Sequence, residues 1–353
     1  MTSPSSHCRL KIDTGLEQGD FAMDRIRVGV IGVGSLGQHH ARVYASLPEV
    51  ELVGIVDPFP GRADEIAGKF GTRVFSDYTE LFGKVDAVNI ATPTTLHAEI
   101  GISCLEQGLH VLVEKPITHT LEDADRLIQA AQKHNRILQI GHLERFNPAV
   151  VALREIVTRP RFFEAHRMGL FSPRSLDVDV ILDLMIHDLD IISLLVPSPV
   201  EKITAVGIAI MSNRIDIANA RMQFADGCVA NITASRVSME KIRKLRLFQK
   251  QEYISLDYTR QDLAVFSLKQ NAGTPLPEIV NRKIEPEKKE PLLLEIVSFL
   301  ETIRGIRPVA CSGDEGRRAL SLALRVREQA ETAQAGEIDR LPDGFHTMTG
   351  NVR

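Results

Sequence analysis

The sequence has few cysteines, no apolar run long enough to cross a bilayer, and no excess of basic charge. Its four cysteines, Cys8, Cys104, Cys228 and Cys311, are scattered without C-x-x-C spacing. This scattered arrangement argues against a disulfide framework or a zinc site and favours a reducing cytoplasm. A net charge of −4 provides no general basic field. We therefore expect neither nucleic acid nor a membrane as a partner.

At 353 residues the chain is longer than one hydrophobic core usually serves, which predicts two folded domains. Its 44% hydrophobic and 25% charged residues are ordinary for a soluble globular protein. Residues 1–22 are polar and lack the apolar core of a signal peptide, so we expect a disordered extension there. Residues 337–353 are expected to form a tail.

A glycine-rich turn directly follows the first predicted strand, residues 28–31, and a helical pattern follows the turn. Its sequence is Gly32-Val33-Gly34-Ser35-Leu36-Gly37. Gly32 suits the tight turn, Gly34 lets a pyrophosphate approach the backbone, and Gly37 lets the helix pack closely. A second predicted strand ends in Asp57, whose carboxylate suits the ribose hydroxyls of a dinucleotide. This context favours a dinucleotide site over a purely structural turn, and Asp57 favours NAD over NADP.

Strand and helix patterns alternate from residue 25 to about residue 141, with short connections. This alternation is typical of a parallel, doubly wound sheet with right-handed crossovers. From residue 203 to residue 268, strand patterns instead follow one another without helices, and Asp226-Gly227 is a two-residue hairpin signal. The second half is therefore predicted to form a mostly antiparallel sheet.

Three polar loops follow predicted parallel strands at their carboxyl ends, where doubly wound sheets bind ligands. The loops contain Thr92-Pro93-Thr94-Thr95-Leu96-His97, Glu114-Lys115-Pro116 and Gly141-His142-Leu143-Glu144-Arg145-Phe146-Asn147-Pro148. Any one of these charged residues is typical of a solvated loop. Together, on the side where the glycine turn would place a nicotinamide, they predict a reaction site.

These motifs together resemble the Gfo/Idh/MocA family, the glucose–fructose oxidoreductase and inositol dehydrogenase group. The most specific is Glu114-Lys115-Pro116, and the resemblance extends from about residue 23 to residue 336. It implies an α/β protein with a Rossmann domain at 23–146 and an α+β domain with a large, mostly antiparallel open sheet at 147–336. It also implies NAD contacts from Gly32, Val33, Gly34, Ser35, Leu36, Gly37, Asp57, Thr92, Pro93, His97, Glu114 and Lys115. An exposed open sheet would favour a homodimer or homotetramer.

A predicted helix over residues 179–195 carries Asp183 and His187, four residues apart on one face. Their neighbours are apolar, so the helix is predicted to be largely buried, and buried polar groups need a reason. The resemblance implies that Asp183 and His187 complete a catalytic group with Lys115, without a metal. His187 suits the base and Lys115 a donor at the developing alkoxide. The sequence leaves open which of the two takes the proton.

Residues 141–148 and 174–180 are most similar to bacterial members that act on UDP-N-acetylglucosamine at its 3-hydroxyl. The expected substrate contacts are Arg145, Asn147, Arg174, Asp183 and His187, and Arg167 is a further candidate for the diphosphate. Three alternatives stay open: an inositol or free-sugar dehydrogenase, a non-catalytic dinucleotide- or sugar-binding regulator, and an enzyme that recycles bound NAD during glycoside cleavage. The intact Lys115, Asp183 and His187 set argues against the regulator.

Overall fold

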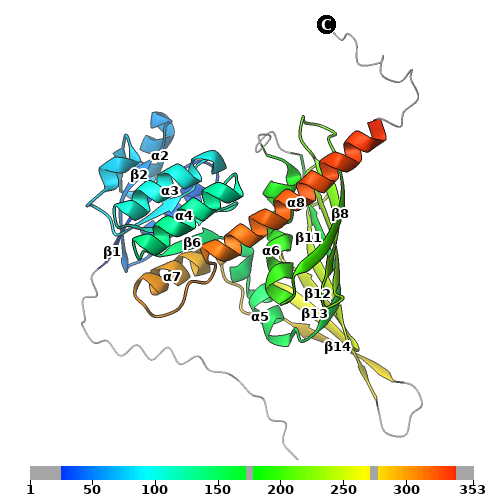
Figure 1. The fold of residues 1–353 in the computed structure, drawn as a ribbon. Helices are drawn as coiled ribbons and strands as arrows, with labels where there is room; N and C mark the ends of the chain where they lie inside the picture. Colours follow the sequence, from blue (N-terminus) through cyan, green and yellow to red (C-terminus); the bar gives the residue numbers. More distant parts are fainter. Residues whose placement is uncertain (1–24, 172–177, 271–276, 339–353) are drawn as a thin grey trace, which may run out of the picture.

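Two β-sheets organise the protein, and the computed structural model describes residues 25–171, 178–270 and 277–338 (Figure 1). The predicted extension, residues 1–22, lies outside the described residues. So does the predicted tail from residue 339 onward, whereas residues 337 and 338 belong to the last helix. None of the described helices combines the length and apolar character needed to cross a membrane.

The first sheet is entirely parallel and has the order β3-β2-β1-β4-β5-β6. Its strands are β1 (Ile26–Ile31), β2 (Val50–Val56), β3 (Arg73–Phe75), β4 (Ala87–Ile90), β5 (His110–Glu114) and β6 (Leu138–Gly141). The helices that connect them are α1 (Gly37–Ser46), α2 (Pro60–Phe70), α3 (His97–Glu106) and α4 (Leu121–Lys133). The predicted doubly wound sheet is confirmed. Strand order reverses between β1 and β4, where such sheets bind ligands.

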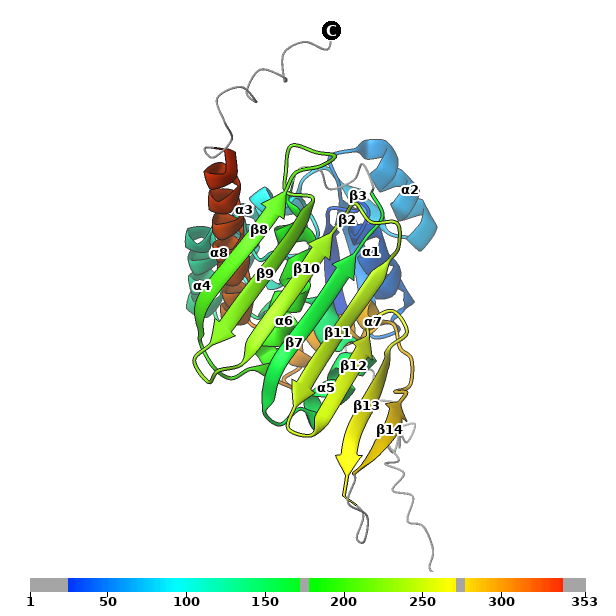
Figure 2. The same cartoon turned by 90° about the vertical axis from the view of Figure 1, so that its right-hand side faces the viewer.

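The second sheet has the order β14-β13-β12-β11-β7-β10-β9-β8 (Figure 2). Its strands are β7 (Pro160–Met168), β8 (Val200–Ile208), β9 (Ile217–Phe224), β10 (Val229–Ser235), β11 (Ile242–Gln249), β12 (Glu252–Asp257), β13 (Asp262–Lys269) and β14 (Glu278–Ile284). Among the described strands of this sheet, only β7 and β10 pair in parallel, so the mostly antiparallel prediction is confirmed. The predicted hairpin joins β9 to β10, with Gly227 at a φ of +83°.

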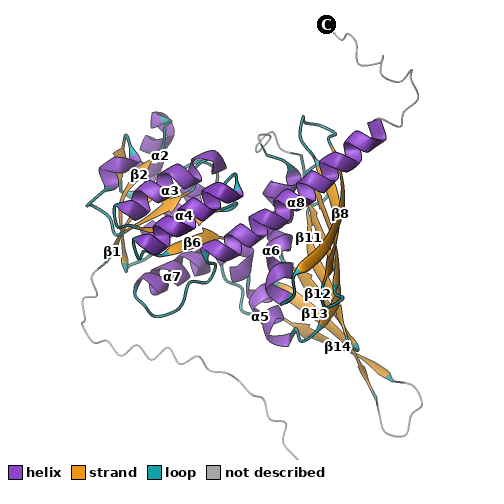
Figure 3. Ribbon diagram, in the orientation of Figure 1, coloured by secondary structure: helices purple, strands orange, loops and turns teal. Residues whose placement is uncertain are grey.

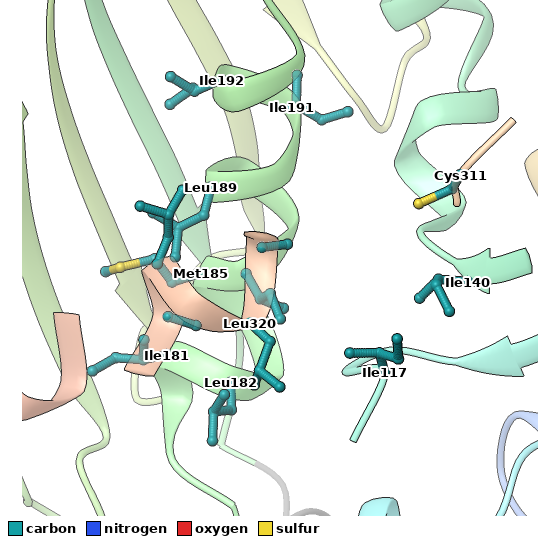
Figure 4. Close-up of a cluster of buried hydrophobic side chains, with 14 of the residues drawn as sticks. Ile117, Ile140, Ile181, Leu182, Met185, Leu189, Ile191, Ile192, Cys311 and Leu320 are labelled. Carbon is teal, nitrogen blue, oxygen red and sulfur yellow. The ribbon is translucent and has the colours of Figure 1, made fainter. Parts of the chain in front are cut away.

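Helices cover one face of the second sheet and leave the other open (Figures 2 and 3). The covering elements are α5 (Pro148–Ile156), the π-turn η4 (Ile181–Met185), α6 (Ile186–Leu195) and the long α8 (Gly313–Ile338). Figure 4 shows apolar side chains of η4 and α6, among them Ile181, Met185 and Leu189, which are buried in the core between the elements. The single helix predicted over 179–195 is therefore two elements, because a π-turn precedes the α-helix.

Helix α7 (Pro291–Ile303) returns from the C-terminal part of the chain to the first sheet (Figure 1). Its apolar side chains Leu292, Ile296 and Phe299 share a core with β1 and α1. The core around β1 and α1 is thus completed by residues more than 240 positions away in the sequence. One side chain of α7, Glu295, lies close to Glu114 at the carboxyl end of β5.

Candidate functional site

The glycine turn has one closed side and one open side. Gly32 has a φ of +85°, and a Cβ atom there would lie 2.7 Å from the carbonyl oxygen of Ala91. A Cβ atom at Gly37 would lie 1.8 Å from the carbonyl oxygen of Gly32, so the helix start requires glycine. At Gly34 the nearest atom would be a guanidinium nitrogen of Arg62, 3.7 Å away. The open side at Gly34 therefore leaves room for a ligand that approaches the backbone.

Free backbone donors surround this open side. Within the described part of the chain, the amides of residues 34–37 donate to no protein acceptor. They lie at the N-terminus of α1, where the positive end of the helix dipole favours a phosphate. The arrangement fits the pyrophosphate of a dinucleotide.

Asp57 fixes the turn and marks the adenosine side of the site. Its carboxylate accepts hydrogen bonds from the amide of Val33 at 2.9 Å and from the amide of Phe59 at 3.0 Å. Arg62 lies 3.8 Å from the same carboxylate, and its guanidinium stacks over the exposed Phe59 ring. A negative charge, a cation and an exposed aromatic ring therefore meet where β2 ends.

His97 joins two of the predicted loops instead of facing the open side. Its ring nitrogens lie 3.0 Å from the carbonyl oxygens of Thr92 and Pro116, and burial lowers its pKa. A neutral imidazole has one N–H, so it donates to one of these carbonyls at a time. The Thr92 hydroxyl is buried without a partner among the described residues, and Pro93 is exposed. Thr92 and Pro93 are thus available to a cofactor, while His97 supports the loops that carry them.

Lys115 and Asp183 are brought into contact across 68 residues of sequence. The Lys115 Nζ donates to the backbone carbonyl of Asp183 at 2.7 Å and to its carboxylate at 3.2 Å. Asp183 is placed by the π-turn η4, whose start is capped by Asp179 through the amides of Ile181 and Leu182, each at 2.9 Å. π-Turns inside helices are frequent at functional sites, because the wider turn redirects side chains and carbonyls.

His187 lies four residues after Asp183, in the first turn of α6. Its Nδ1 atom is buried and has no partner among the described residues. Burial, followed by the charges of Lys115 and Arg167, holds the pKa of His187 well below its usual value. The imidazole is therefore neutral at neutral pH, which is the form that can accept a proton.

Two of the predicted substrate contacts are engaged within the framework. Arg145 is buried and donates to Asp190 at 2.8 and 2.6 Å and to Glu315 at 2.7 Å. Asn147 caps α5 by accepting from the amide of Ala149, and it donates to a backbone carbonyl at 2.9 Å. These contacts hold both side chains within the fold, and the substrate contacts predicted for them stay predictions.

Arg167 behaves similarly, and Arg174 lies outside the described residues. The Arg167 guanidinium donates to Asp188 at 2.8 and 3.2 Å and to Glu144 at 2.9 Å. The acidic partners of Arg145 and Arg167 are between 21 and 170 residues away in sequence. No local pattern could have identified them.

Glu114 is buried, and neighbouring protein groups engage its carboxylate. Its carboxylate lies 2.8 Å from Nε2 of His40 and accepts the amide of Lys115 at 3.2 Å. His40 was not predicted as a site residue, although a histidine on the buried face of α1, three residues after Gly37, was the available signal. Glu295 of α7, which lies close to both, was not predicted either.

Proteins of known family match most of this chain. The "Oxidoreductase family, NAD-binding Rossmann fold" matches residues 26–142, and the "GFO/IDH/MocA C-terminal domain" matches residues 154–251. UDP-N-acetylglucosamine 3-dehydrogenase of Acidithiobacillus ferrooxidans is 41% identical over 312 residues, which is 88% of this chain and 98% of that one. A solved structure of that enzyme has a TM-score of 0.81 at 40% identity, covering 88% of this chain and 99% of its own. Myo-inositol 2-dehydrogenase of Thermotoga maritima is 27% identical over 335 residues, 90% and 99% of the two chains.

Proposed function

Because the chain belongs to the Gfo/Idh/MocA oxidoreductase family, and is a dehydrogenase of CH–OH groups, we propose that it oxidises the 3-hydroxyl of a UDP-linked N-acetylhexosamine with NAD. The observation that carries the proposal is the contact of Lys115 with Asp183, beside a neutral His187, at the ligand-binding edge of the first sheet. The similarity to UDP-N-acetylglucosamine 3-dehydrogenase supplies the substrate class.

The residues of the site divide the work of alcohol oxidation. The glycine turn and Asp57 would hold NAD, which would supply the hydride acceptor. Lys115, anchored by the carbonyl and carboxylate of Asp183, donates a hydrogen bond to the hydroxyl oxygen as it becomes an alkoxide. His187 is neutral and takes the hydroxyl proton as general base. The substrate thereby loses one hydride and one proton and becomes a ketone.

We propose NAD over NADP as the cofactor. The buried Asp57 carboxylate at the end of β2 would repel a 2′-phosphate, and it suits the ribose hydroxyls of NAD. Arg62 is the residue that opposes this preference, since its guanidinium lies 3.8 Å from Asp57 and is partly exposed. Arg62 would have to turn away from Asp57 to neutralise a phosphate.

We also propose a homo-oligomer formed through the open face of the second sheet. Half-buried aromatic side chains form a row across four neighbouring strands. They alternate along these strands with buried side chains, so they belong to the face that the helices leave free, and Figure 2 shows the strands of that face. The row consists of Phe162, Phe248, Tyr253 and Phe266, and adjacent ring centroids are 5.0–5.8 Å apart. Aromatic surface of this kind is favoured in subunit interfaces.

The test is a substrate comparison in a coupled assay. Oxidation to a ketone by NAD is unfavourable on its own, so the assay contains an aminotransferase and glutamate to remove the 3-keto product. We expect NADH formation with UDP-N-acetylglucosamine and far less with free N-acetylglucosamine, because nucleotide binding energy positions the sugar. Rapid reaction of myo-inositol or a free hexose, with none of the UDP-sugar, would establish the alternative dehydrogenase. NAD binding without turnover of any sugar would favour the regulator.

Arg174 supplies the sharper variant for the nucleotide part. We expect Arg174→Ala to raise KM for the UDP-sugar about tenfold or more and to leave any slow reaction of free sugar unchanged. The exposed Arg161 at the start of β7 provides the matched control, and Arg161→Ala should change neither reaction. If Arg174→Ala and Arg161→Ala had equal effects on both substrates, Arg174 would not be a diphosphate contact.

A further inference from the structure

Three titratable side chains from distant parts of the chain meet beneath the Glu114–Lys115 turn. They are His40 of α1, Glu114 at the end of β5 and Glu295 of α7, and all three are buried. One ligand atom from each lies within 4.8 Å of those of the other two. Nε2 of His40 is 2.8 Å from the carboxylate of Glu114. The group joins the first helix, the strand that ends directly before Lys115 and a helix from the C-terminal part of the chain.

Several polar atoms around this group have no partner among the described residues. Both carboxyl oxygens of Glu295 are unpartnered although the residue has no exposed surface, and so are Nδ1 of His40 and the hydroxyl of Tyr44. Two carboxyl groups this close in a buried site repel each other strongly when both are ionised, and His40 offsets only the charge of Glu114, its hydrogen-bonded neighbour. We therefore expect the group to contain at least one carboxyl proton.

The surroundings decide which carboxyl keeps the proton. Burial opposes ionisation of Glu114, but the hydrogen bond and charge of His40 hold its pKa below the usual value. Glu295 has no donor of this kind, and burial together with the charge of Glu114 raises its pKa well above the usual value. The other titratable groups near Glu295 are Tyr44 and Cys311, whose pKa values burial also raises, so both stay neutral. Glu295 is the carboxylic acid and Glu114 the carboxylate.

We propose that Glu295 is a positioning residue that stays protonated and donates a hydrogen bond to the Glu114 carboxylate through one buried water. The separation of up to 4.8 Å, with no direct hydrogen bond, suits a single bridging water. Glu114 in turn accepts the backbone amide of Lys115 at 3.2 Å. Helix α7 thereby holds the turn that presents Lys115. The effect on Lys115 rests on the proposed function, whereas the protonation of Glu295 does not.

The protonation is tested on the full chain with Glu295→Gln and with Glu301→Gln as the matched control. Glu301 lies on the same helix, is partly exposed and pairs with Arg307 at 2.8 Å. In the infrared spectrum at pH 8, Glu295→Gln should remove a protonated carboxylic acid band, and Glu301→Gln should remove only carboxylate absorption. A wild-type spectrum without that band, or one equivalent of divalent metal in the purified protein, would overturn the proposal.

The pH dependence of stability gives a second reading with a definite sign. When folding raises the pKa of a carboxyl, the folded protein loses stability as the pH rises above the pKa of that carboxyl in the unfolded chain, about 4.3 for Glu. Glu295→Gln removes this titrating carboxyl. The Tm of the variant minus the Tm of the wild type should therefore increase from pH 5 to pH 8. Glu301→Gln should show no such gain. A Tm difference for Glu295→Gln that is constant over this range would show that Glu295 is ionised.

Activity separates positioning from packing. Glu295→Leu removes the donor while filling similar volume, and we expect its kcat to fall about tenfold with unchanged NAD affinity. Glu295→Gln should restore most of the rate, because its amide can donate to the same water. Full kcat in Glu295→Leu would overturn the positioning role. If the wild type oxidises no sugar, the proposed function fails, and the infrared and Tm measurements still decide the protonation.

Discussion

Replacing Arg145 tests whether this arginine supports the fold or binds the substrate. The sequence predicts a substrate contact, and the structure shows a buried guanidinium that holds Asp190 with two hydrogen bonds and Glu315 with a third. Arg145→Ala would leave Asp190, which is 2% exposed, without its cation. Glu315 would be less affected, because it also accepts the amide of Ser312 at 2.9 Å. The cost of the change is therefore centred on Asp190.

The expected loss of stability follows from that uncompensated charge. Removing one partner of a buried ion pair typically costs about 3–5 kcal/mol. A cavity of about 620 Å³ between α6 and α8 reaches Arg145 and Asp190, so water can enter after truncation. We therefore expect the lower end of this range, about 3 kcal/mol. For a chain of 353 residues this corresponds to a fall in Tm of roughly 4 °C. Arg145→Met combined with Asp190→Leu should recover at least half of this, since a buried pair can be replaced by apolar groups of similar volume.

Urea unfolding and steady-state kinetics of the same variants distinguish the two roles. Arg260→Ala is the control, because Arg260 pairs with Asp257 and Asp262 at the surface and should cost less than about 1 kcal/mol. A framework role lowers the unfolding midpoint of Arg145→Ala and leaves KM for the UDP-sugar within about threefold. A variant as stable as Arg260→Ala, with KM raised tenfold, would refute this reasoning and restore the substrate contact.

Two further predictions concern the reaction site. Lys115→Ala and His187→Ala should each lower kcat at least about a hundredfold with NAD affinity nearly unchanged, and Asp183→Asn should lower kcat less than either. Stopped-flow kinetics and NAD titration measure these effects. Near-normal turnover of Lys115→Ala would contradict the role assigned to Lys115. The wild type should have a higher kcat/KM with NAD than with NADP. Asp57→Ser should lower the ratio of the NAD value to the NADP value, and Arg62→Ala should raise it. Comparable efficiency with the two cofactors in the wild type would contradict the role of Asp57.

The glycine turn and the parallel sheet could be predicted because their determinants are local. Gly32, Gly34, Gly37 and Asp57 follow a fixed spacing along one strand–turn–helix–strand unit. Strand β7 was missed for an equally physical reason. Its inward positions are Phe163, Ala165 and then the charged Arg167, so the alternation of apolar and polar residues breaks down near its end.

Long-range pairing sets the limit of what the sequence could predict for the site. The contact of Lys115 with Asp183 was reached only through the family resemblance, because 68 residues separate the two. The loop of residues 141–148, which was also predicted to contribute to the site, carries Arg145, whose partner Asp190 is 45 residues away. In sequence, a solvated loop arginine and a buried paired arginine look alike. Only the positions of the acidic partners separate a binding residue from a framework residue.

The last prediction concerns the state of His187 before the substrate arrives. Since burial and the charge of Lys115 lower its pKa, its imidazole NMR signal, assigned with His187→Asn, should not titrate between pH 8 and pH 6. The unfolded chain binds more protons than the folded one below about pH 6.5, so this histidine should cost stability as pH falls through that value. Lys115→Met removes the neighbouring charge and should raise the pKa of His187 towards its usual value, whereas Lys115→Arg retains the charge and should not. A wild-type signal that titrates near pH 6.5, unchanged in Lys115→Met, would show that His187 is neither desolvated nor coupled to Lys115, and its assignment as the neutral base would fail.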